Sequence, residues 1–229
     1  MARLGEPFLK LPPMRRLGDL GDAAFTATVA EAHARELRAV GITMSFAPVA
    51  DVHTREDNPI IGDRAFATTP EGVAAMAGAW ADGLSRAGLL TCAKHFPGHG
   101  DTTVDSHLAL PRVDRDRAGL DAIEIAPFRA LARRPSVDAM MTAHVVYPSL
   151  DPERPATLSA AISTQLLRRD LGFEGVLFSD DLEMKAIALP AGEAAVAAVL
   201  AGCDVLLVCS REDLADEAHA ALVREAEAS

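Results

Sequence analysis

The 229-residue chain is poor in aromatic side chains, in cysteine and in positive charge. Aromatic residues make up 4% of the sequence, so a core drawn from the 49% hydrophobic residues has to be mainly aliphatic. The cysteines Cys92, Cys203 and Cys209 lie in apolar runs without CxxC spacing. This pattern favours buried, reduced thiols and a cytoplasmic protein over a disulfide-stabilised secreted one.

The shortage of positive charge also limits the kinds of partner. Lys and Arg number 22 against 33 Asp and Glu, which gives a net charge of -11. Nucleic-acid binding depends on neutralising phosphates with basic side chains, so we expect no nucleic-acid partner. Charges, glycines and prolines interrupt the first 22 residues, and Gly202 and Asp204 break the most apolar stretch. We therefore predict no signal peptide and no membrane partner.

Apolar runs and helical patterns alternate along the chain. The runs are continuous, as is typical of parallel strands covered on both faces, and span residues 42–52, 89–96, 139–146, 175–182 and 204–209. Helices are predicted at 23–40, 70–87 and 114–133, and from a Ser159 cap to Gly172, with Thr68 and Glu71 as a capping box before the second. This order predicts an α/β fold.

Polar residues follow each predicted strand: Asp51-Val52-His53, Lys94-His95, His144, Ser179-Asp180-Asp181 and Ser210-Arg211. The carboxyl ends of the strands hold the active site in a (β/α)8 barrel and the ligand in an open α/β sheet. Only five strands are predicted, and the residues before Ile42 offer a loop and one helix. The pattern alone leaves open whether the sheet is open or a barrel is incomplete.

Two segments carry most of the chemistry. The loop KHFPGHGDTTVDSH at residues 94–107 places Asp105 two residues before His107, where a carboxylate can orient an imidazole and stabilise its cation. The run FEGVLFSDDLEM at residues 173–184 ends a predicted strand in two carboxylates. Because side chains alternate along a strand, Asp180 and Asp181 should point in different directions.

With these two motifs the sequence closely resembles the bacterial family 3 glycoside hydrolases that act as β-N-acetylhexosaminidases. Shorter matches are SFAPV at 45–49 with Asp51, IGDRAF at 61–66, MTAHV at 141–145 and AGCD at 201–204. The resemblance implies a (β/α)8 TIM-barrel type fold, incomplete here, with strands four to eight of the family barrel. Residues 1–229 would then form a partial catalytic barrel domain.

The resemblance also implies a role for each matching residue. Asp180 is similar to the catalytic nucleophile, with Asp181 structural, and His107 to the acid/base residue, with Asp105 as its partner. The residues expected to bind substrate are Arg3, Arg64, Lys94 and His95. His144 is expected to orient a neighbour, whereas Asp51, His53, His99 and Asp101 could line the pocket or brace loops.

The implied reaction is a retaining exo-hydrolysis that removes terminal β-linked N-acetylglucosamine from muropeptides in peptidoglycan recycling, without a cofactor. One alternative is a glycoside phosphorylase, because a neutral imidazole repels phosphate less than a carboxylate does. Another is a metal-dependent hydrolase with the ligands His95, His99, Asp101, Asp105 and His107. A third is an inactive fragment, since a barrel without three strands has unpaired edges.

Overall fold

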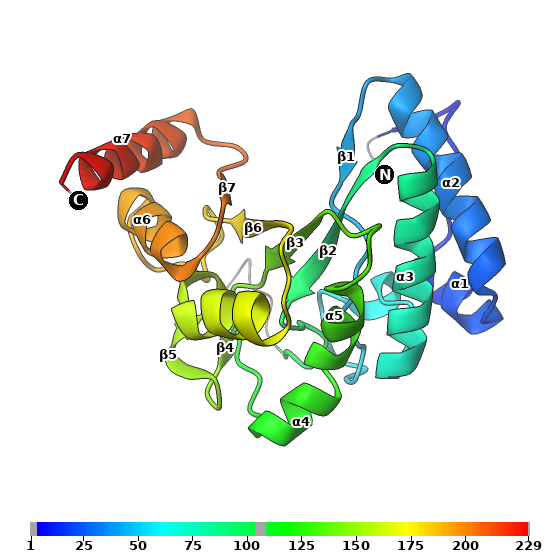
Figure 1. Ribbon diagram of the computed structural model, residues 1–229, viewed down its shortest axis with the longest axis horizontal. Coiled ribbons are helices and arrows are strands. Elements are labelled where there is room, and N and C mark those ends of the chain that lie inside the picture. The colour runs from blue at the N-terminus through cyan, green and yellow to red at the C-terminus, as the bar shows by residue number, and fades with distance from the viewer. Residues whose placement is uncertain (1–3, 104–108, 229) are drawn as a thin grey trace.

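The computed structural model of the chain describes residues 4–103 and 109–228, and its helices and strands alternate (Figure 1). The strands are β1 (Met44–Ser45), β2 (Leu90–Phe96), β3 (Ala139–Thr142), β4 (Val146–Tyr147), β5 (Asp151–Pro155), β6 (Val176–Asp181) and β7 (Val205–Leu207). The α-helices are α1 (Met14–Leu20), α2 (Ala23–Ala39), α3 (Pro70–Arg86), α4 (Arg117–Ala122), α5 (Ile125–Leu131), α6 (Ala191–Ala201) and α7 (Glu212–Ala228). Two 3₁₀ segments, η1 (Gly62–Arg64) and η2 (Ala156–Leu158), and the π-helix η3 (Ala161–Asp170) complete the described elements.

The main sheet has five strands in the order β1-β2-β3-β6-β7, and every neighbouring pair is parallel. Cys92 of β2 pairs with Ala139 of β3, and Ala139 pairs with Val176 of β6, while the register shifts after Lys94 in β2 and after Phe178 in β6. The predicted α/β class and five parallel strands are confirmed, and the sheet is an incomplete barrel. All five carboxyl ends therefore meet at one edge of the sheet.

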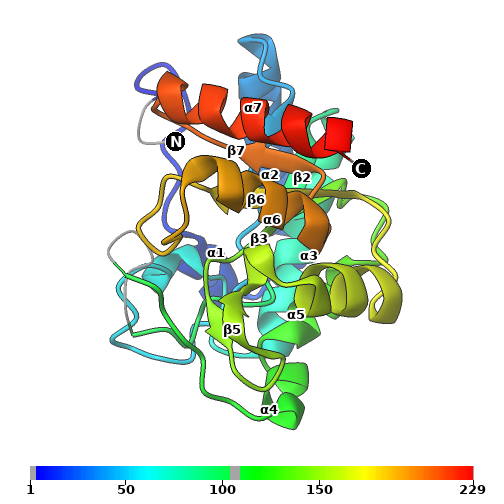
Figure 2. The ribbon, with the colours of Figure 1, turned by 90° about the vertical axis from the view of Figure 1, so that its left-hand side faces the viewer.

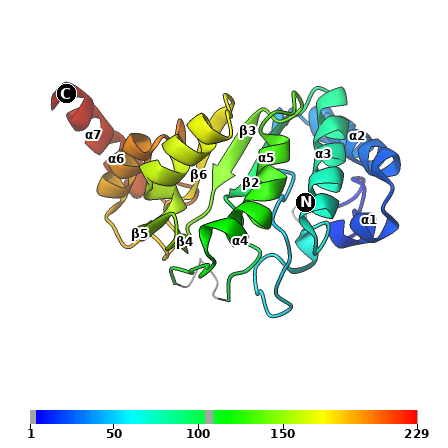
Figure 3. The same cartoon turned by 60° about the horizontal axis from the view of Figure 1, so that its bottom comes forward.

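Helices follow one another along the outer side of the sheet, from α2 and α3 at one end through α5 to α6 and α7 at the other (Figures 1 and 3). The largest apolar cluster is buried here and includes Leu84, Phe96, Phe128 and Leu177. Figure 2 shows α7 lying along α6, beside the edge strand β7. The helices thus supply the mainly aliphatic core that the composition predicts.

The inner face of the sheet changes character along its strands. Buried Cys92 and Met141 pack here with Phe178, and Phe46 meets the Phe178 ring edge to face at 5.3 Å. Side chains two residues apart point to the same face, so Lys94 follows Cys92 and Asp180 follows Phe178 on this side. The inner face is therefore apolar along the strands and ends at the carboxyl edge in a cation, Lys94, and a carboxylate, Asp180.

Several predicted element boundaries are wrong for local reasons. The helix expected at 114–133 is split into α4 and α5, because Pro127 has no N–H to donate to Ile123 and fits only in the first turn of a new helix. The cap of α3 is Thr69, not Thr68: its side chain accepts from Gly72 N at 3.3 Å, with Pro70 as the first helical residue.

The region around Ser159 also differs from the prediction. The Ser159 hydroxyl donates to Asp151 Oδ2 at 2.7 Å and does not cap the helix that follows, which is the π-helix η3. The β4–β5 hairpin and α1 were not predicted. None of the helices in residues 4–103 and 109–228 combines the length and apolar character of a membrane span.

Candidate active site

Four of the five strands of the main sheet deliver ionisable side chains to its carboxyl edge. Asp180 lies near the end of β6, Lys94 and His95 near the end of β2, His144 two residues after β3, and Asp51 six residues after β1. Of these, His95 is 6% exposed, while Asp51 and His144 are fully buried. The edge predicted to hold the active site is therefore also where buried charge collects.

Asp180 is held as a carboxylate. Its Oδ1 accepts the Asp181 backbone N–H at 2.9 Å. Burial alone would raise the pKa of Asp180, but the cationic forms of His95 and His144, the Asp181 N–H and Lys94 outweigh it and hold the pKa below its ordinary value. Asp181 has different neighbours, with Oδ1 accepting from Glu183 N at 3.1 Å. The ionised Asp180 is suited to nucleophilic attack.

His144 links the ends of β3 and β6. Its Nε2 lies 2.9 Å from the Asp181 carbonyl oxygen, and its Nδ1 lies 2.7 Å from Thr157 Oγ1. A carbonyl can only accept, so Nε2 carries the proton. Burial lowers the pKa of His144 against the opposing influence of Asp180, so the neutral ring accepts at Nδ1 from Thr157. His144 thus contacts the backbone beside Asp180, as expected of an orienting residue.

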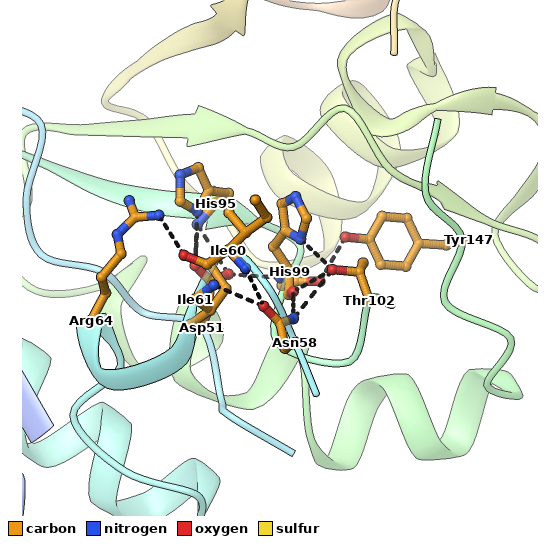
Figure 4. A network of polar contacts seen from close by, with 10 residues as sticks. Asp51, Asn58, Ile60, Ile61, Arg64, His95, His99, Thr102 and Tyr147 are labelled. Carbon is orange, nitrogen blue, oxygen red and sulfur yellow. Dashed lines mark hydrogen bonds and ion pairs between the residues drawn. The ribbon is translucent and has the colours of Figure 1, made fainter. Parts of the chain in front are cut away.

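Asp51, His95 and His99 form a buried polar cluster in the site (Figure 4). Asp51 accepts from His95 Nδ1 at 2.8 Å and from His99 N at 2.7 Å. Burial and the neighbouring His95 lower the pKa of His99 to about 4, so its ring is neutral at physiological pH. The His99 Nδ1 lies 2.7 Å from Thr102 Oγ1. His99 and Asp51 therefore brace the loop and the strand end rather than face solvent.

Lys94 places a cation near Asp180, and Arg64 adds a second cation near Lys94. The Arg64 guanidinium donates to Ile60 O at 3.0 Å, and this turn is shaped by Asn58, whose Oδ1 accepts from Ile61 N at 2.8 Å (Figure 4). Burial lowers the pKa of Lys94, and nearby Arg64 lowers it further, against the opposing influence of Asp180. Two cations beside a carboxylate suit a polar ligand that bears several hydroxyl groups.

The loop that follows β2 is anchored from three sides. Tyr147 donates to Gly98 O at 2.7 Å, and Asp101 accepts from Thr54 Oγ1 at 2.7 Å. Arg115 joins Asp101 and Glu124, with both contacts at 2.9 Å. Burial raises the pKa of Glu124 to about 7, although Arg115 opposes this. These anchors fix residues 97–103, which lead toward the predicted acid/base pair.

Not every predicted residue can be placed in the site. Arg3, Asp105 and His107 lie outside the described residues. His53 is not joined to the Asp180 cluster by any contact in the described part of the chain, where its buried Nδ1 has no hydrogen-bond partner. In the same ranges no three His, Cys, Asp or Glu side chains gather as a potential metal site.

Sequence reasoning did not identify the contacts of two residues that shape this site. For Asp51 it left open whether the residue lines the pocket or braces a loop, although its position after SFAPV in the family match was a usable signal. Asn58 was not singled out, yet its amide donates to His99 O at 3.0 Å while its carbonyl shapes the turn that carries Arg64. Both act between segments that are distant in sequence.

Comparisons with known proteins agree with this geometry. The chain is 46% identical over 224 residues to a beta-hexosaminidase of Neisseria meningitidis serogroup C, covering 94% of this chain and 61% of that relative. The structure of a family 3 β-N-acetylglucosaminidase from Paenibacillus sp. FPU-7 superposes with a TM-score of 0.96 at 44% identity, over 99% of this chain and 43% of that one.

NagZ from Neisseria gonorrhoeae, in complex with N-trifluoroacetyl-D-glucosamine, is similar at a TM-score of 0.87 and 44% identity, over 94% of this chain and 64% of that one. This chain thus spans less than two thirds of the length of these relatives. The model of the glycosyl hydrolase family 3 N-terminal domain matches residues 1–228. The chain therefore belongs to glycosyl hydrolase family 3.

Proposed function

We propose that this chain carries the active site of a retaining exo-β-N-acetylglucosaminidase. The observation that carries the proposal is Asp180, a half-buried carboxylate whose pKa is held low by nearby cations, at the carboxyl edge of a family 3 sheet. Relatives named beta-hexosaminidase and a relative in complex with an N-acylated glucosamine support the sugar class. Localisation in the cytoplasm and muropeptides as substrates are part of the same proposal.

The reaction proceeds in two displacements at the anomeric carbon. In the first, an Asp180 oxygen attacks that carbon while protonated His107 gives its proton to the leaving glycosidic oxygen, which forms a glycosyl ester. In the second, neutral His107 takes a proton from water, and the resulting hydroxide attacks the anomeric carbon and releases Asp180 as a carboxylate. Asp105 orients the imidazole and stabilises its cation in both steps.

The remaining residues bind the sugar. Arg64, Lys94 and His95, together with Arg3, donate to or accept from its hydroxyl groups, and the cations keep Asp180 ionised. No cofactor takes part. Residues 1–229 act as the partial catalytic barrel domain. Its partner is the small carbohydrate substrate, and neither a nucleic acid nor a membrane is involved.

The stereochemistry of the first product tests this proposal. With 4-nitrophenyl β-N-acetylglucosaminide followed by proton NMR, we expect the β-anomer of N-acetylglucosamine to appear first and the α-anomer to grow in later by mutarotation. An α-anomer that appears first would contradict a covalent Asp180 intermediate. If added phosphate diverts the product to the sugar 1-phosphate, the enzyme is a phosphorylase instead.

The substrate itself needs a separate comparison. We expect the disaccharide N-acetylglucosaminyl-1,6-anhydro-N-acetylmuramyl peptide to be hydrolysed with a higher kcat/KM than chitobiose, because the proposed substrate is a muropeptide. Equal or reversed kcat/KM values would contradict muropeptides as the substrate and would not contradict the glycosidase activity.

A further inference from the structure

Asp51 uses both carboxylate oxygens on the segment that contains the sugar-binding residues. Oδ1 accepts from His95 N at 3.2 Å and from His99 N at 2.7 Å, while Oδ2 lies 2.8 Å from His95 Nδ1 (Figure 4). The side chain is 0% exposed. A carboxylate this deeply buried has to be compensated by its hydrogen-bond partners, and here two of those three partners belong to one residue.

The backbone explains why Asp51 faces a residue 44 positions away. After β1 the chain runs on beside β2, where Val49 forms a parallel bridge with Lys94 and Ala50 N donates to Lys94 O at 2.7 Å. Asp51 is two residues beyond this bridge, and its side chain reaches back to His95, the residue that follows Lys94. The contact is therefore fixed by the packing of the chain after β1 against the end of β2.

The chemistry of the pair determines the state of the imidazole. Burial alone would raise the pKa of Asp51, but His95 and His99 outweigh it and hold the pKa below its ordinary value, so the group is a carboxylate. An ionised carboxylate only accepts, so His95 Nδ1 must carry a proton. In the neutral ring Nε2 is then the acceptor nitrogen, which suits a sugar hydroxyl group.

We propose that Asp51 is a positioning residue of the active site, whose carboxylate keeps Nδ1 of His95 protonated and fixes the ring so that Nε2 serves the substrate. This inference rests on the proposed function, in which His95 binds a sugar hydroxyl. Asp51 itself acts through His95 and does not touch the sugar. Among the charges that lower the pKa of Asp180, the cationic form of His95 has the largest influence, so the placement of this ring affects the nucleophile.

Asp138 provides a matched control on the same strands. It lies just before β3, at the amino edge of the sheet, and accepts from Thr91 N at 2.9 Å at the start of β2. Asp51 and Asp138 therefore both tie two parallel strand segments together through a backbone N–H. Only Asp51 also binds a ring that faces Asp180, so a purely structural role predicts similar effects for the two residues.

The first test is the protonation of His95 in the full chain. Long-range ¹H–¹⁵N NMR of protein labelled with ¹⁵N-histidine, with His95 assigned from the spectrum of His95→Ala, distinguishes Nδ1–H from Nε2–H. We expect His95 to be protonated at Nδ1 throughout pH 6–8 in the wild-type chain and to lose this state in Asp51→Asn. A neutral ring protonated only at Nε2 in the wild-type chain would overturn the inference, and this readout does not require the enzyme to turn over.

The second test is kinetic and uses a double-mutant cycle. Asp51→Asn should lower kcat/KM for 4-nitrophenyl β-N-acetylglucosaminide about 10- to 100-fold, because a misplaced group costs up to about 100-fold. Asp138→Asn should stay within about threefold of wild type, since its contacts are remote from the reacting atoms. In a His95→Ala background, Asp51→Asn should add less than about threefold, because its effect passes through His95.

The outcomes separate this inference from the proposed function. The inference would be overturned if the losses of kcat/KM for Asp51→Asn and His95→Ala were additive. It would also be overturned if Asp51→Asn and Asp138→Asn lost kcat/KM equally. In either case Asp51 would have only a structural role. A wild-type chain that does not hydrolyse the substrate would contradict the proposed function, whereas the NMR result would still decide how Asp51 and His95 are related.

Discussion

The two edges of the main sheet use charge in opposite ways. At the amino edge, two carboxylates have direct partners: Asp204 pairs with Arg168 at 2.5 Å and accepts from Leu177 N at 2.7 Å, and Asp138 accepts from Thr91 N at 2.9 Å. At the carboxyl edge two cations, Lys94 and Arg64, lie near each other, and the charge of Arg64 lowers the pKa of Lys94. Such crowding costs stability and is typical of functional sites.

This contrast shows where stability and function are separated in the molecule. Charges at the amino edge join neighbouring elements, so their loss should lower stability and leave chemistry intact. Groups at the carboxyl edge shift one another's pKa values, so their loss should change chemistry first. Variants at the two edges can therefore be compared directly.

The largest expected effect is that of Asp180→Ala. Removing the nucleophile should lower kcat for 4-nitrophenyl β-N-acetylglucosaminide by about 10⁴-fold or more, since no covalent intermediate can form. The amino-edge control, Asp204→Asn, should keep kcat within about threefold of wild type and lower the melting temperature instead. The contrast between the edges fails if Asp180→Ala retains more than a hundredth of the wild-type rate.

A smaller but more selective effect is expected from His107→Ala. Loss of a general acid typically costs about 10² to 10⁴ in rate, and only leaving groups that need a proton should suffer fully. A disaccharide substrate should therefore be affected far more than an activated aryl glycoside, and Asp105→Ala should reproduce much of the defect. If both substrates slow equally, His107 shapes the loop and does not transfer a proton.

The fold was predictable because its main signals are local. Continuous aliphatic runs identified all five parallel strands, since strands covered on both faces need apolar residues at every position. What failed depended on single atoms or distant partners. Pro127 splits a helix that its neighbours would continue, and Ser159 bonds to Asp151 rather than to its own helix.

The site was predictable only in part, for a similar reason. Asp180, Lys94 and His95 stand at strand ends, and this position can be read from the sequence. The contacts of Asp51 with His95 and of Asn58 with His99 join segments 44 and 41 residues apart and depend on how these segments pack together, which no local pattern reports. Motif reasoning therefore identified the chemistry but not these two contacts.

A moderate effect on both stability and rate is expected at His144. In His144→Ala the Asp181 carbonyl loses its histidine donor, while Thr157 keeps its contacts with Thr142 and Ala143, and the change should cost about 1–3 kcal/mol of unfolding free energy. The displaced Asp181 backbone should also lower kcat about tenfold with little change in KM, because a shifted nucleophile costs rate. His144→Gln, which can still donate to a carbonyl, should recover part of kcat. Wild-type kcat in His144→Ala would contradict the orienting role.

The smallest expected effect is a difference in pH dependence between the edges. The pKa of Glu124, near the carboxyl edge, is raised from 4.5 to about 7, so the folded state binds a proton that the unfolded state releases, and stability falls as pH rises through this range. Arg134 and Ser136 overcome partial burial to lower the pKa of Asp82, near the amino edge, so its stabilisation is lost as pH falls below about 4.

Urea unfolding at pH 5 and pH 8 measures this difference. From pH 5 to pH 8, the free energy of unfolding of Glu124→Gln should rise by roughly 1–2 kcal/mol relative to that of the wild type. The reason is that the wild-type carboxyl must ionise while buried. Asp82→Asn should be destabilised at both pH values and approach wild type only in more acidic solution. If the stability of Glu124→Gln has the same pH dependence as the wild type, Glu124 is not the source of that dependence.

Covalent labelling of the nucleophile tests the central claim most directly. The chain is incubated with 5-fluoro-N-acetylglucosaminyl fluoride, which forms the glycosyl ester quickly and hydrolyses it slowly, and a peptic digest is then sequenced by mass spectrometry. We predict one added sugar on the peptide from β6, at Asp180, and none on the same peptide from Asp180→Ala. A label on Asp181 with Asp180 unmodified would contradict the account, as would turnover of the fluoride with no labelled carboxylate.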